Sequence, residues 1–399
     1  MRMRFKFVQI EDVVNGLVHD PSFQGSGQQF SALDGKVNYK EVISTCELST
    51  DLKSLIGFGD IRDTILSDWR GIVERNQFRP SGNLNLKNLL SFGTRGLLLD
   101  LDRHVALVGG ALNWGDDYAR YYISTAPPQY QCQLFENDHS FEIDIPSVFP
   151  TEARPGIFMM GPGQDIYGHW LLDYAPRLML AGLVDGPEAP RYYFGNLPHW
   201  TAPILASFGV SASAICPAPT SDFVYYPRIA MPSATKIGYR LSQPINRMAW
   251  LRLKNMLLNM PITLQERIRI PNASQIFVSR KSWGSSRAIE NASRLEEIAA
   301  KRGFTIVHPE EYSLPGQARI FNRARAILGE DGSGLHNIIF SEPGCRLGVV
   351  SIPERVNLWH LGICEQLEHS IAYIVTESNT HGARLADETA FNQLIDVIG

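Results

Sequence analysis

Short apolar runs alternate with segments of helical spacing throughout the C-terminal part of the chain. Leu295, Ile298 and Ala299 recur as on one face of a helix, and Gly303 stands where a C-cap glycine is expected. The resulting βαβαβαβαβ order predicts a parallel sheet with helices on both faces, and in such sheets ligands bind beyond the carboxyl ends of the strands. The predicted strands are 275–281, 304–309, 326–328, 346–352 and 371–377, and the predicted helices are 293–303, 313–325, 335–340 and 357–367.

The pattern is less regular before residue 272. Residues 95–110 and 221–233 are rich in strand-forming residues, and residues 165–184 have the pattern of a helix bent near Pro176, where one intrahelical hydrogen bond is lost. The sequence therefore predicts an α/β protein of two domains. The predicted parts are an N-terminal α/β domain (1–240, of which 1–150 has no clear assignment), a linker helix (241–271), a C-terminal Rossmann-like domain (272–375) and a last helix (376–399).

The composition of the chain indicates which broad class of protein it belongs to. The hydrophobic fraction of 44% and charged fraction of 20% are typical of a soluble globular chain, and the net charge of −4 gives no general attraction for nucleic acid. The N-terminal stretch has no long apolar run, and Glu11 and Asp12 interrupt it early, which is unlike a signal peptide. The five cysteines include no CxxC pair, which argues against a disulfide framework and a cysteine-rich zinc site. We expect a reduced, cytoplasmic protein.

A glycine-rich turn, "GEDGSGLHN" at residues 329–337, follows the third predicted strand. It is not a P-loop, because Leu335 stands where the lysine is required, and Ser333 lacks the flanking glycines of a nucleophile elbow. Gly332 and Gly334 are expected to adopt backbone angles closed to other residues and to leave room for a ligand. The helix that follows would offer unpaired N–H groups to an anion.

Two arginines point to the nature of that anion. Arg280 ends the first strand of the same predicted sheet, and Arg287 lies in the loop after it. Because the carboxyl ends of neighbouring parallel strands meet, both guanidinium groups are expected near the glycine turn, where their planar forks suit phosphate oxygens. The sequence therefore favours a diphosphate site. The alternative is a plain βα turn with two surface arginines in ordinary ion pairs.

Three segments in this order resemble glycosyltransferase family 61, whose members are also described as capsular polysaccharide biosynthesis or DUF563 proteins. They are "HWLLDYAPRL" (169–178), "SRKSWGSSRAIEN" (279–291) and "HPEEYSLPGQARIFNRARAILGEDGSGLHNIIFSEPG" (308–344). The resemblance implies a GT-B architecture, with a cleft between two Rossmann-like domains. It also implies inverting, metal-independent transfer from a nucleotide sugar, usually UDP-linked, without a cofactor.

The resemblance and the local pattern together suggest roles for individual residues. His169 and Asp173 share one helical face, and either is a candidate for the base that accepts the acceptor proton. The alternative is a helix-surface pair. Glu310 would accept ribose hydroxyls, or, with Glu311, simply flank a helix. The expected donor-binding residues are Arg280, Arg287, Glu310, Gly332, Ser333, Gly334, Leu335, His336 and Asn337.

One departure from the family pattern keeps other functions open. Many members read HGAGLTN at the turn, whereas this chain has Asp331, whose charge would repel a diphosphate unless it points away or pairs with an arginine. A non-catalytic nucleotide-sugar-binding subunit of a polysaccharide assembly complex is therefore one alternative. A metal-dependent transferase using Asp100 and Asp102 as a DxD motif is another.

The expected partners follow from the expected reaction. They are a nucleotide-sugar donor and a glycan or lipid-linked glycan acceptor in the cytoplasm, with no nucleic acid and no metal. Association with the inner face of the membrane, with an assembly complex or with a second copy of the chain is left open by the sequence.

Overall fold

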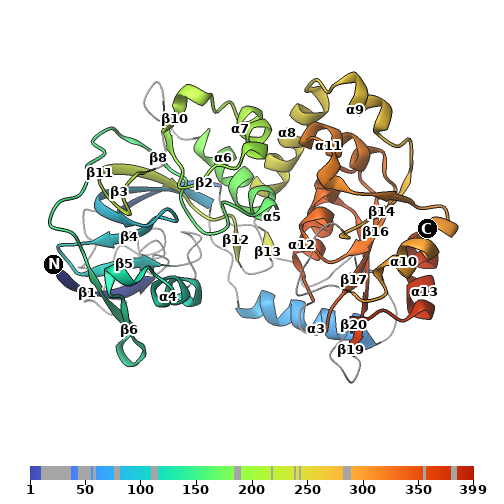
Figure 1. The fold of residues 1–399 in the computed structure, drawn as a ribbon, viewed down its shortest axis with the longest axis horizontal. Helices are drawn as coiled ribbons and strands as arrows, with labels where there is room; N and C mark the ends of the chain where they lie inside the picture. The colour runs from blue at the N-terminus through green and yellow to red at the C-terminus, as the bar shows by residue number, and fades with distance from the viewer. Residues whose placement is uncertain are drawn as a thin grey trace. The chain divides into compact units, whose positions relative to one another are not determined.

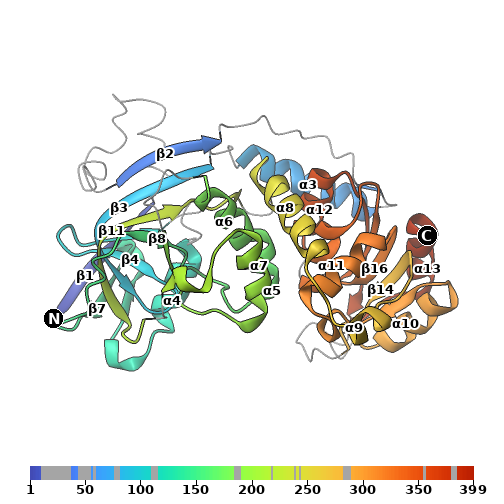
Figure 2. The same cartoon turned by 90° about the horizontal axis from the view of Figure 1, so that it is seen from above.

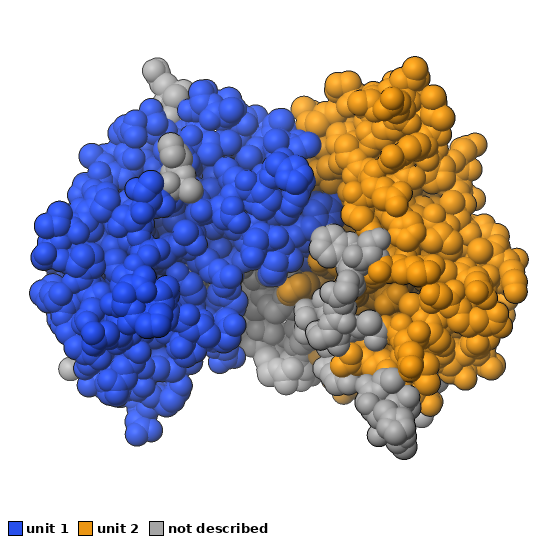
Figure 3. Space-filling model, viewed as in Figure 1, with its two compact units in different colours: residues 1–45, 79–236 blue, residues 46–78, 237–399 orange. Residues whose placement is uncertain are grey.

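The computed structural model contains both α-helices and β-sheets, and the chain forms two compact units (Figure 3). Unit 1 comprises Met1–Thr45 and Arg79–Lys236, and unit 2 comprises Cys46–Phe78 and Ile237–Gly399. The structure describes residues 1–9, 37–43, 55–56, 60–75, 81–108, 116–183, 190–216, 219–237, 240–241, 244–281, 289–353, 356–378 and 384–399.

Unit 2 is built on the parallel sheet that the sequence predicts, and its strands run in the order β15-β14-β16-β17-β18. All neighbouring pairs are parallel, and every residue of β16 is buried, as expected of a strand covered on both faces. The strands are β14 (Gln275–Val278), β15 (Thr305–Val307), β16 (Ala326–Glu330), β17 (Arg346–Ser351) and β18 (Ser370–Val375).

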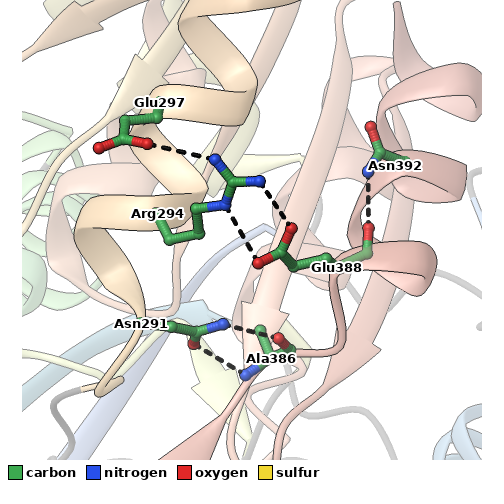
Figure 4. A network of polar contacts seen from close by, with 6 residues as sticks. All are labelled: Asn291, Arg294, Glu297, Ala386, Glu388 and Asn392. Carbon is green, nitrogen blue, oxygen red and sulfur yellow. Dashed lines mark hydrogen bonds and ion pairs between the residues drawn. The ribbon is translucent and has the colours of Figure 1, made fainter.

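Helices cover both faces of this sheet (Figures 1 and 2). Helices α10 (Ala292–Lys301) and α13 (Glu388–Ile398) bury Leu295, Phe391 and Leu394 against one face. Figure 4 shows how these two helices are joined: Arg294 donates two hydrogen bonds to the Glu388 carboxylate, each 3.1 Å, and Asn291 pairs with the backbone of Ala386. Associated with the other face are α11 (Leu314–Arg323), the 3₁₀ helix η8 (Ser333–Phe340) and α12 (Trp359–Leu367).

Local signals in the sequence are confirmed at the ends of these helices. The Ser313 hydroxyl caps α11 by accepting from the Gly316 N–H at 3.2 Å, and Pro315 lies in the first turn. Gly303 follows α10 with φ +91°, a left-handed conformation that favours glycine. The last helix, predicted at 376–399, is shorter: α13 begins at Glu388, where Asp387 caps it, and Glu377–Ser378 and Arg384–Leu385 are strands.

Further segments complete unit 2. Ile56 donates from its backbone to the carbonyl of Ile371, so residues of the segment 46–78 pair with the edge strand β18. The linker helix predicted at 241–271 is two helices, because α8 (Ile245–Asn259) ends before Pro261 and a second helix begins at Leu264. The remaining elements of this unit are α3 (Asp60–Arg75), α9 (Leu264–Arg269), the 3₁₀ helix η7 (Pro309–Glu311), and strands β13 (Arg240–Leu241), β19 (Glu377–Ser378) and β20 (Arg384–Leu385); β13 pairs with β12 (Lys236–Ile237).

Over its described residues, unit 1 is built on a mixed sheet of eleven strands. Its parallel part has the order β10-β9-β8-β11, in which the strand order reverses between β8 and β11 as in a Rossmann-like sheet. From β11 to β3, β4 and β5 the pairing is antiparallel, and short turns join β3 to β4 and β4 to β5. The expected Rossmann-like order is therefore seen in only part of unit 1. The strands are β1 (Arg2–Gln9), β2 (Val37–Ile43), β3 (Ser81–Phe92), β4 (Leu97–Asp100), β5 (Val105–Val108), β6 (Gln133–Phe135), β7 (Ser140–Asp144), β8 (Gly156–Phe158), β9 (Arg191–Tyr193), β10 (Ile215–Cys216) and β11 (Phe223–Pro232).

The helix predicted at 165–184 is divided by a wider turn. The α-helical turn α5 (Tyr167–His169) continues as a π-helix, η4 (Trp170–Tyr174), and then as α6 (Ala175–Ala181). The Ala175 N–H donates to the carbonyl of Trp170, five residues earlier, just before Pro176 removes the next donor. The other helices of unit 1 are α4 (Asp116–Ser124), α7 (Ala202–Ser207) and the 3₁₀ helices η2 (Pro128–Tyr130), η3 (Glu136–Asp138), η5 (His199–Thr201) and η6 (Ala212–Ala214). Within the described ranges of both units, no helix has the length and apolar character required to span a bilayer.

Candidate active site

The strand order of unit 2 reverses between β14 and β16, and at such a switch point the carboxyl ends of two strands border a ligand-binding crevice. Arg280 follows β14, and the glycine-rich turn follows β16. A guanidinium N–H of Arg280 donates to the backbone carbonyl of Asp331, so the arginine is fixed on the turn. The structure thereby brings together two features that are 51 residues apart in the sequence.

At Gly332 an added side chain would meet this contact, whereas the backbone angles are open to any residue. Its φ of 167° is extended and open to any residue, and Gly334 is not among the glycines with positive φ. The expectation of special angles is therefore wrong for both. A Cβ atom at position 332 would lie only 2.8 Å from Nη1 of Arg280, whereas one at position 334 would lie 3.2 Å from a methyl group of Val278. A side chain at position 332 would therefore have to displace the guanidinium group from its place over the turn.

The helix after the turn is 3₁₀ rather than α. The Leu335 N–H donates to the Gly332 carbonyl three residues earlier, and the tighter winding rises about 2.0 Å per residue instead of about 1.5 Å. Eight residues therefore cover more of the distance back to the start of β17. Ser333 and Gly334 are partly exposed, whereas residues 329–332 and 335–337 are buried, so the accessible part of the turn is Ser333 and Gly334.

Asp331 points away from this accessible part. Successive residues of a strand face opposite sides of a sheet, so Glu330 is directed toward α10 and Asp331 toward α12. One Asp331 carboxylate oxygen accepts hydrogen bonds from the Asn357 amide at 3.2 Å and from His360 Nε2 at 2.9 Å. Asp331, the residue that departs from the family pattern, therefore links the turn to α12 through buried hydrogen bonds.

The sequence analysis did not single out Glu330, which is buried beside Arg280 at the end of β16. Burial raises the pKa of Glu330, and the positive charge of Arg280 opposes that rise. The signal that could have identified it is the alternation of the strand, which places position 330 on the face opposite to position 331. Glu330 adds a titratable group to the surroundings of Arg280.

The other predicted donor-side residues have different positions. Glu310 lies in η7, after β15, and is exposed at the same carboxyl edge of the sheet. Glu311 accepts a hydrogen bond from Arg269 through its backbone carbonyl. Arg287 lies outside the described residues.

The predicted catalytic pair is formed in unit 1. His169 Nδ1 lies 2.5 Å from Asp173 Oδ2. The side chain of His169 is 25% exposed and that of Asp173 is 2% exposed, so the buried carboxylate orients a ring that still reaches solvent. With its Nδ1–H donated to Asp173, a neutral His169 has its lone pair on Nε2, the atom at which it would accept a proton.

The loop between β8 and α5 shapes the surroundings of His169. Gly163 has φ +77°, and a Cβ atom there would lie 2.5 Å from Cγ of the His169 ring, so glycine is needed both for the backbone and for the close approach. Two buried aromatic residues hold the same loop: Trp170 donates to the carbonyl of Gln164 and Tyr174 to that of Pro162, each at 2.8 Å. The loop follows β8, one of the two strands at the reversal of strand order in unit 1.

A buried cation lies one further helical step from the pair. Arg177 is inaccessible to solvent and donates to the carbonyls of Pro232 and Phe158. Burial lowers the pKa of Arg177, while Tyr174 and Asp173 act in the opposite direction. Arg177 thus supplies positive charge near the Asp173 carboxylate. Its place in "HWLLDYAPRL", four residues after Asp173, was the available sequence signal.

The Asp100–Asp102 motif has a structural explanation. It lies at the tight turn between β4 and β5, where an oxygen of the buried Asp100 carboxylate accepts from the backbone N–H groups of Asp102 at 3.0 Å and Arg103 at 3.2 Å. Across the described part of the chain, no three His, Cys, Asp or Glu side chains are grouped as metal ligands would be.

Comparison with known proteins finds a family that part of the chain resembles. Residues 167–348 match the family model described as Glycosyltransferase 61, a region that begins at α5 and ends within β17. It includes His169, Asp173, Arg280 and the glycine-rich turn. No curated protein matches the chain. The resemblance to glycosyltransferase family 61 seen in the sequence is confirmed over residues 167–348.

Proposed function

We propose that this protein is an inverting, metal-independent glycosyltransferase that moves a hexose or pentose from a nucleotide sugar, UDP-linked, to a hydroxyl group of a glycan or lipid-linked glycan. The observation that carries the proposal is the fixed position of Arg280 on the glycine-rich turn, at a switch point of a parallel sheet. The family match supports the reaction class, and a GT-B-like architecture is part of the proposal.

The leaving nucleotide diphosphate is assigned to unit 2. Departure of the diphosphate places negative charge on its oxygens, which require cations or N–H donors nearby. Arg280 uses one N–H on the Asp331 carbonyl, and a guanidinium group has further donors for phosphate oxygens. The backbone N–H groups of Ser333 and Gly334 stand at the start of η8, where helical N–H groups have no acceptor within the helix. Arg287 and Glu310 are proposed as additional donor-binding residues.

The acceptor hydroxyl is assigned to the His169–Asp173 pair. In this step the acceptor oxygen forms a bond to the anomeric carbon, the bond from that carbon to the diphosphate oxygen breaks, and the hydroxyl proton passes to Nε2 of His169. Asp173 holds the imidazole in the required tautomer and stabilises the cation that forms. Direct attack without a covalent intermediate inverts the anomeric configuration.

The alternative of a non-catalytic binding subunit depended on Asp331. The Asp331 carboxylate is turned toward His360 and Asn357. Its charge is therefore no specific argument against diphosphate binding at the turn. The two functions differ in turnover, since a binding subunit would retain the nucleotide sugar intact.

The experiment is a nucleotide-release assay with UDP-, GDP-, ADP-, dTDP- and CMP-linked sugars and a panel of glycan acceptors, in EDTA. The proposal predicts acceptor-dependent release from UDP sugars by the wild-type protein and loss of release in His169→Ala. Binding of a nucleotide sugar without release under any condition would support the binding subunit. Activity that needs Mn²⁺ after EDTA treatment would contradict metal independence.

A further inference from the structure

Helix α9 of unit 2 is held to the protein by its polar side. The Glu266 carboxylate accepts from the backbone N–H of Ser313 at 2.7 Å and from its hydroxyl at 3.0 Å. On the same side, Arg269 donates to the carbonyl of Glu311, and its guanidinium carbon lies 5.3 Å from the ring centre of Tyr312. These contacts fix which face of α9 points inward.

The outward face of α9 is apolar. Leu264 is 70% exposed and Ile268 is 75% exposed, and their spacing of four residues places them side by side on one face. A surface helix normally directs such a stripe into the core and its charges into water, so the amphipathic character of α9 is reversed. The helix is nevertheless well formed, because the Thr263 hydroxyl caps it by accepting from the Glu266 N–H at 3.1 Å.

Two exposed arginines lie on α9 and on the neighbouring helix α11. Arg267 follows Glu266 on α9 and is exposed, and Arg323 is exposed at the end of α11. Burial lowers the pKa of Arg319, and Arg267 and Arg323 lie close enough to lower it further. Glu266 acts in the opposite direction and raises this pKa. Arg319 is bound to the carbonyls of Leu257, Leu258, Met260 and Pro315, and thus joins α11 to the end of α8. Among the residues that the structure describes, neither Arg267 nor Arg323 forms an ion pair with a carboxylate.

We propose that α9 is a docking element for an anionic lipid surface. Leu264 and Ile268 enter the boundary between headgroups and acyl chains, while Arg267 and Arg323 contact lipid phosphates. Aliphatic side chains flanked by arginine are the chemistry of interfacial helices. Two exposed aliphatic side chains offer far less area than the roughly 800 Å² per partner that a stable protein–protein interface buries. The inference is independent of the proposed transfer reaction.

The test is co-sedimentation of the full chain with lipid vesicles, without any sugar substrate. The wild-type protein is expected to bind vesicles rich in phosphatidylglycerol and not vesicles of phosphatidylcholine alone, and added salt should weaken the binding. Removing both charges in Arg267→Gln/Arg323→Gln should lower the partition coefficient by about thirtyfold. Leu264→Asn/Ile268→Asn should lower it by roughly tenfold or more.

Matched controls use exposed residues of unit 1. Val148→Asn replaces an aliphatic side chain that is 84% exposed, and Arg154→Gln/Arg228→Gln removes the same number of charges. Both should bind lipid as the wild type does. Absence of wild-type binding, equal binding to both lipids, or equal loss in the control variants would overturn the proposal. Self-association without lipid that Leu264→Asn/Ile268→Asn abolishes would instead identify a second copy of the chain as the occupant, and would also overturn it.

Discussion

The guanidinium group of Arg280 occupies the space that a side chain at Gly332 would need. A Cβ atom at position 332 would lie 2.8 Å from Nη1 and 2.9 Å from Cζ of Arg280. Gly332→Ala should therefore displace the arginine while leaving the extended backbone of residue 332 undisturbed. We expect UDP binding to weaken roughly ten- to hundredfold, the loss typical of a charge-assisted hydrogen-bonding group. Isothermal titration calorimetry measures it.

Gly334 provides the matched control for this substitution. A Cβ atom there would lie 3.2 Å from a Val278 methyl group and 3.8 Å from a carbon of Pro309, so small shifts can accommodate it. Gly334→Ala should weaken UDP binding much less than Gly332→Ala. Equal effects of the two substitutions would show that Arg280 is not the group disturbed.

A second prediction concerns the roles of His169 and Asp173. Because Asp173 touches His169 Nδ1 and not the proposed substrate, Asp173→Asn should keep the ring in place but favour the wrong tautomer. We expect kcat to fall by roughly 10²- to 10⁴-fold in His169→Ala, and clearly also in Asp173→Asn, with the Kd for UDP unchanged in both. Steady-state kinetics and calorimetry separate the two effects. An active His169→Ala enzyme would remove His169 from the mechanism.

A third prediction concerns the anchor at Asp331. Asp331→Ala would leave the Nε2–H of His360 and the amide of Asn357 without this acceptor in a buried site, which typically costs about 1–3 kcal/mol. Both the free energy of unfolding of unit 2 and the affinity for UDP should fall, since the anchor also positions the turn. Urea unfolding and calorimetry test this, with the exposed Asp68→Ala as the control. An Asp331→Ala protein of wild-type stability would contradict the anchoring role.

A fourth prediction concerns the stability of unit 2 in acid. Burial of His369 lowers its pKa from 6.5 to about 4, helped by the charges of Lys254 and Arg247. Between these values the unfolded chain binds a proton at this position and the folded one does not. The contribution of neutral His369 to the free energy of unfolding is therefore fully present above pH 6.5. It is lost as the pH falls toward 4, by up to roughly 3 kcal/mol.

Urea unfolding of unit 2 across this pH range measures the effect. His369→Gln should flatten the acid side of the stability profile, whereas substitution of the exposed His199 by Gln should not. An unchanged profile in His369→Gln would show that other groups control acid unfolding.

Much of unit 2 could be predicted from the sequence, because local signals and the overall fold agree there. Fully buried strands such as β16 have continuous apolar runs, and Ser313 and Gly303 mark helix ends through their own capping chemistry. Parallel pairing then brings Arg280 to the turn. The contribution of residues 46–78 to unit 2 had no such signal, since the pairing of Ile56 with Ile371 spans a long stretch of chain.

The details of the site depended on packing that local patterns do not encode. Gly332 was expected to be needed for its backbone angles, yet these angles are ordinary and what an added side chain would meet is a distant arginine. The direction of the Asp331 carboxylate is decided by His360, which is on another element. Pro176 predicted a bend in this helix, but a proline does not indicate that the turn before it widens into a π-helix.

The most direct test of the central claim is calorimetric titration of the purified protein with UDP in EDTA, repeated with Arg280→Ala and Arg287→Ala. The account predicts micromolar binding without metal that Arg280→Ala abolishes. Binding that appears only after Mn²⁺ is added, or that persists unchanged in Arg280→Ala, would contradict the assignment of the glycine-rich turn and Arg280 as the diphosphate site.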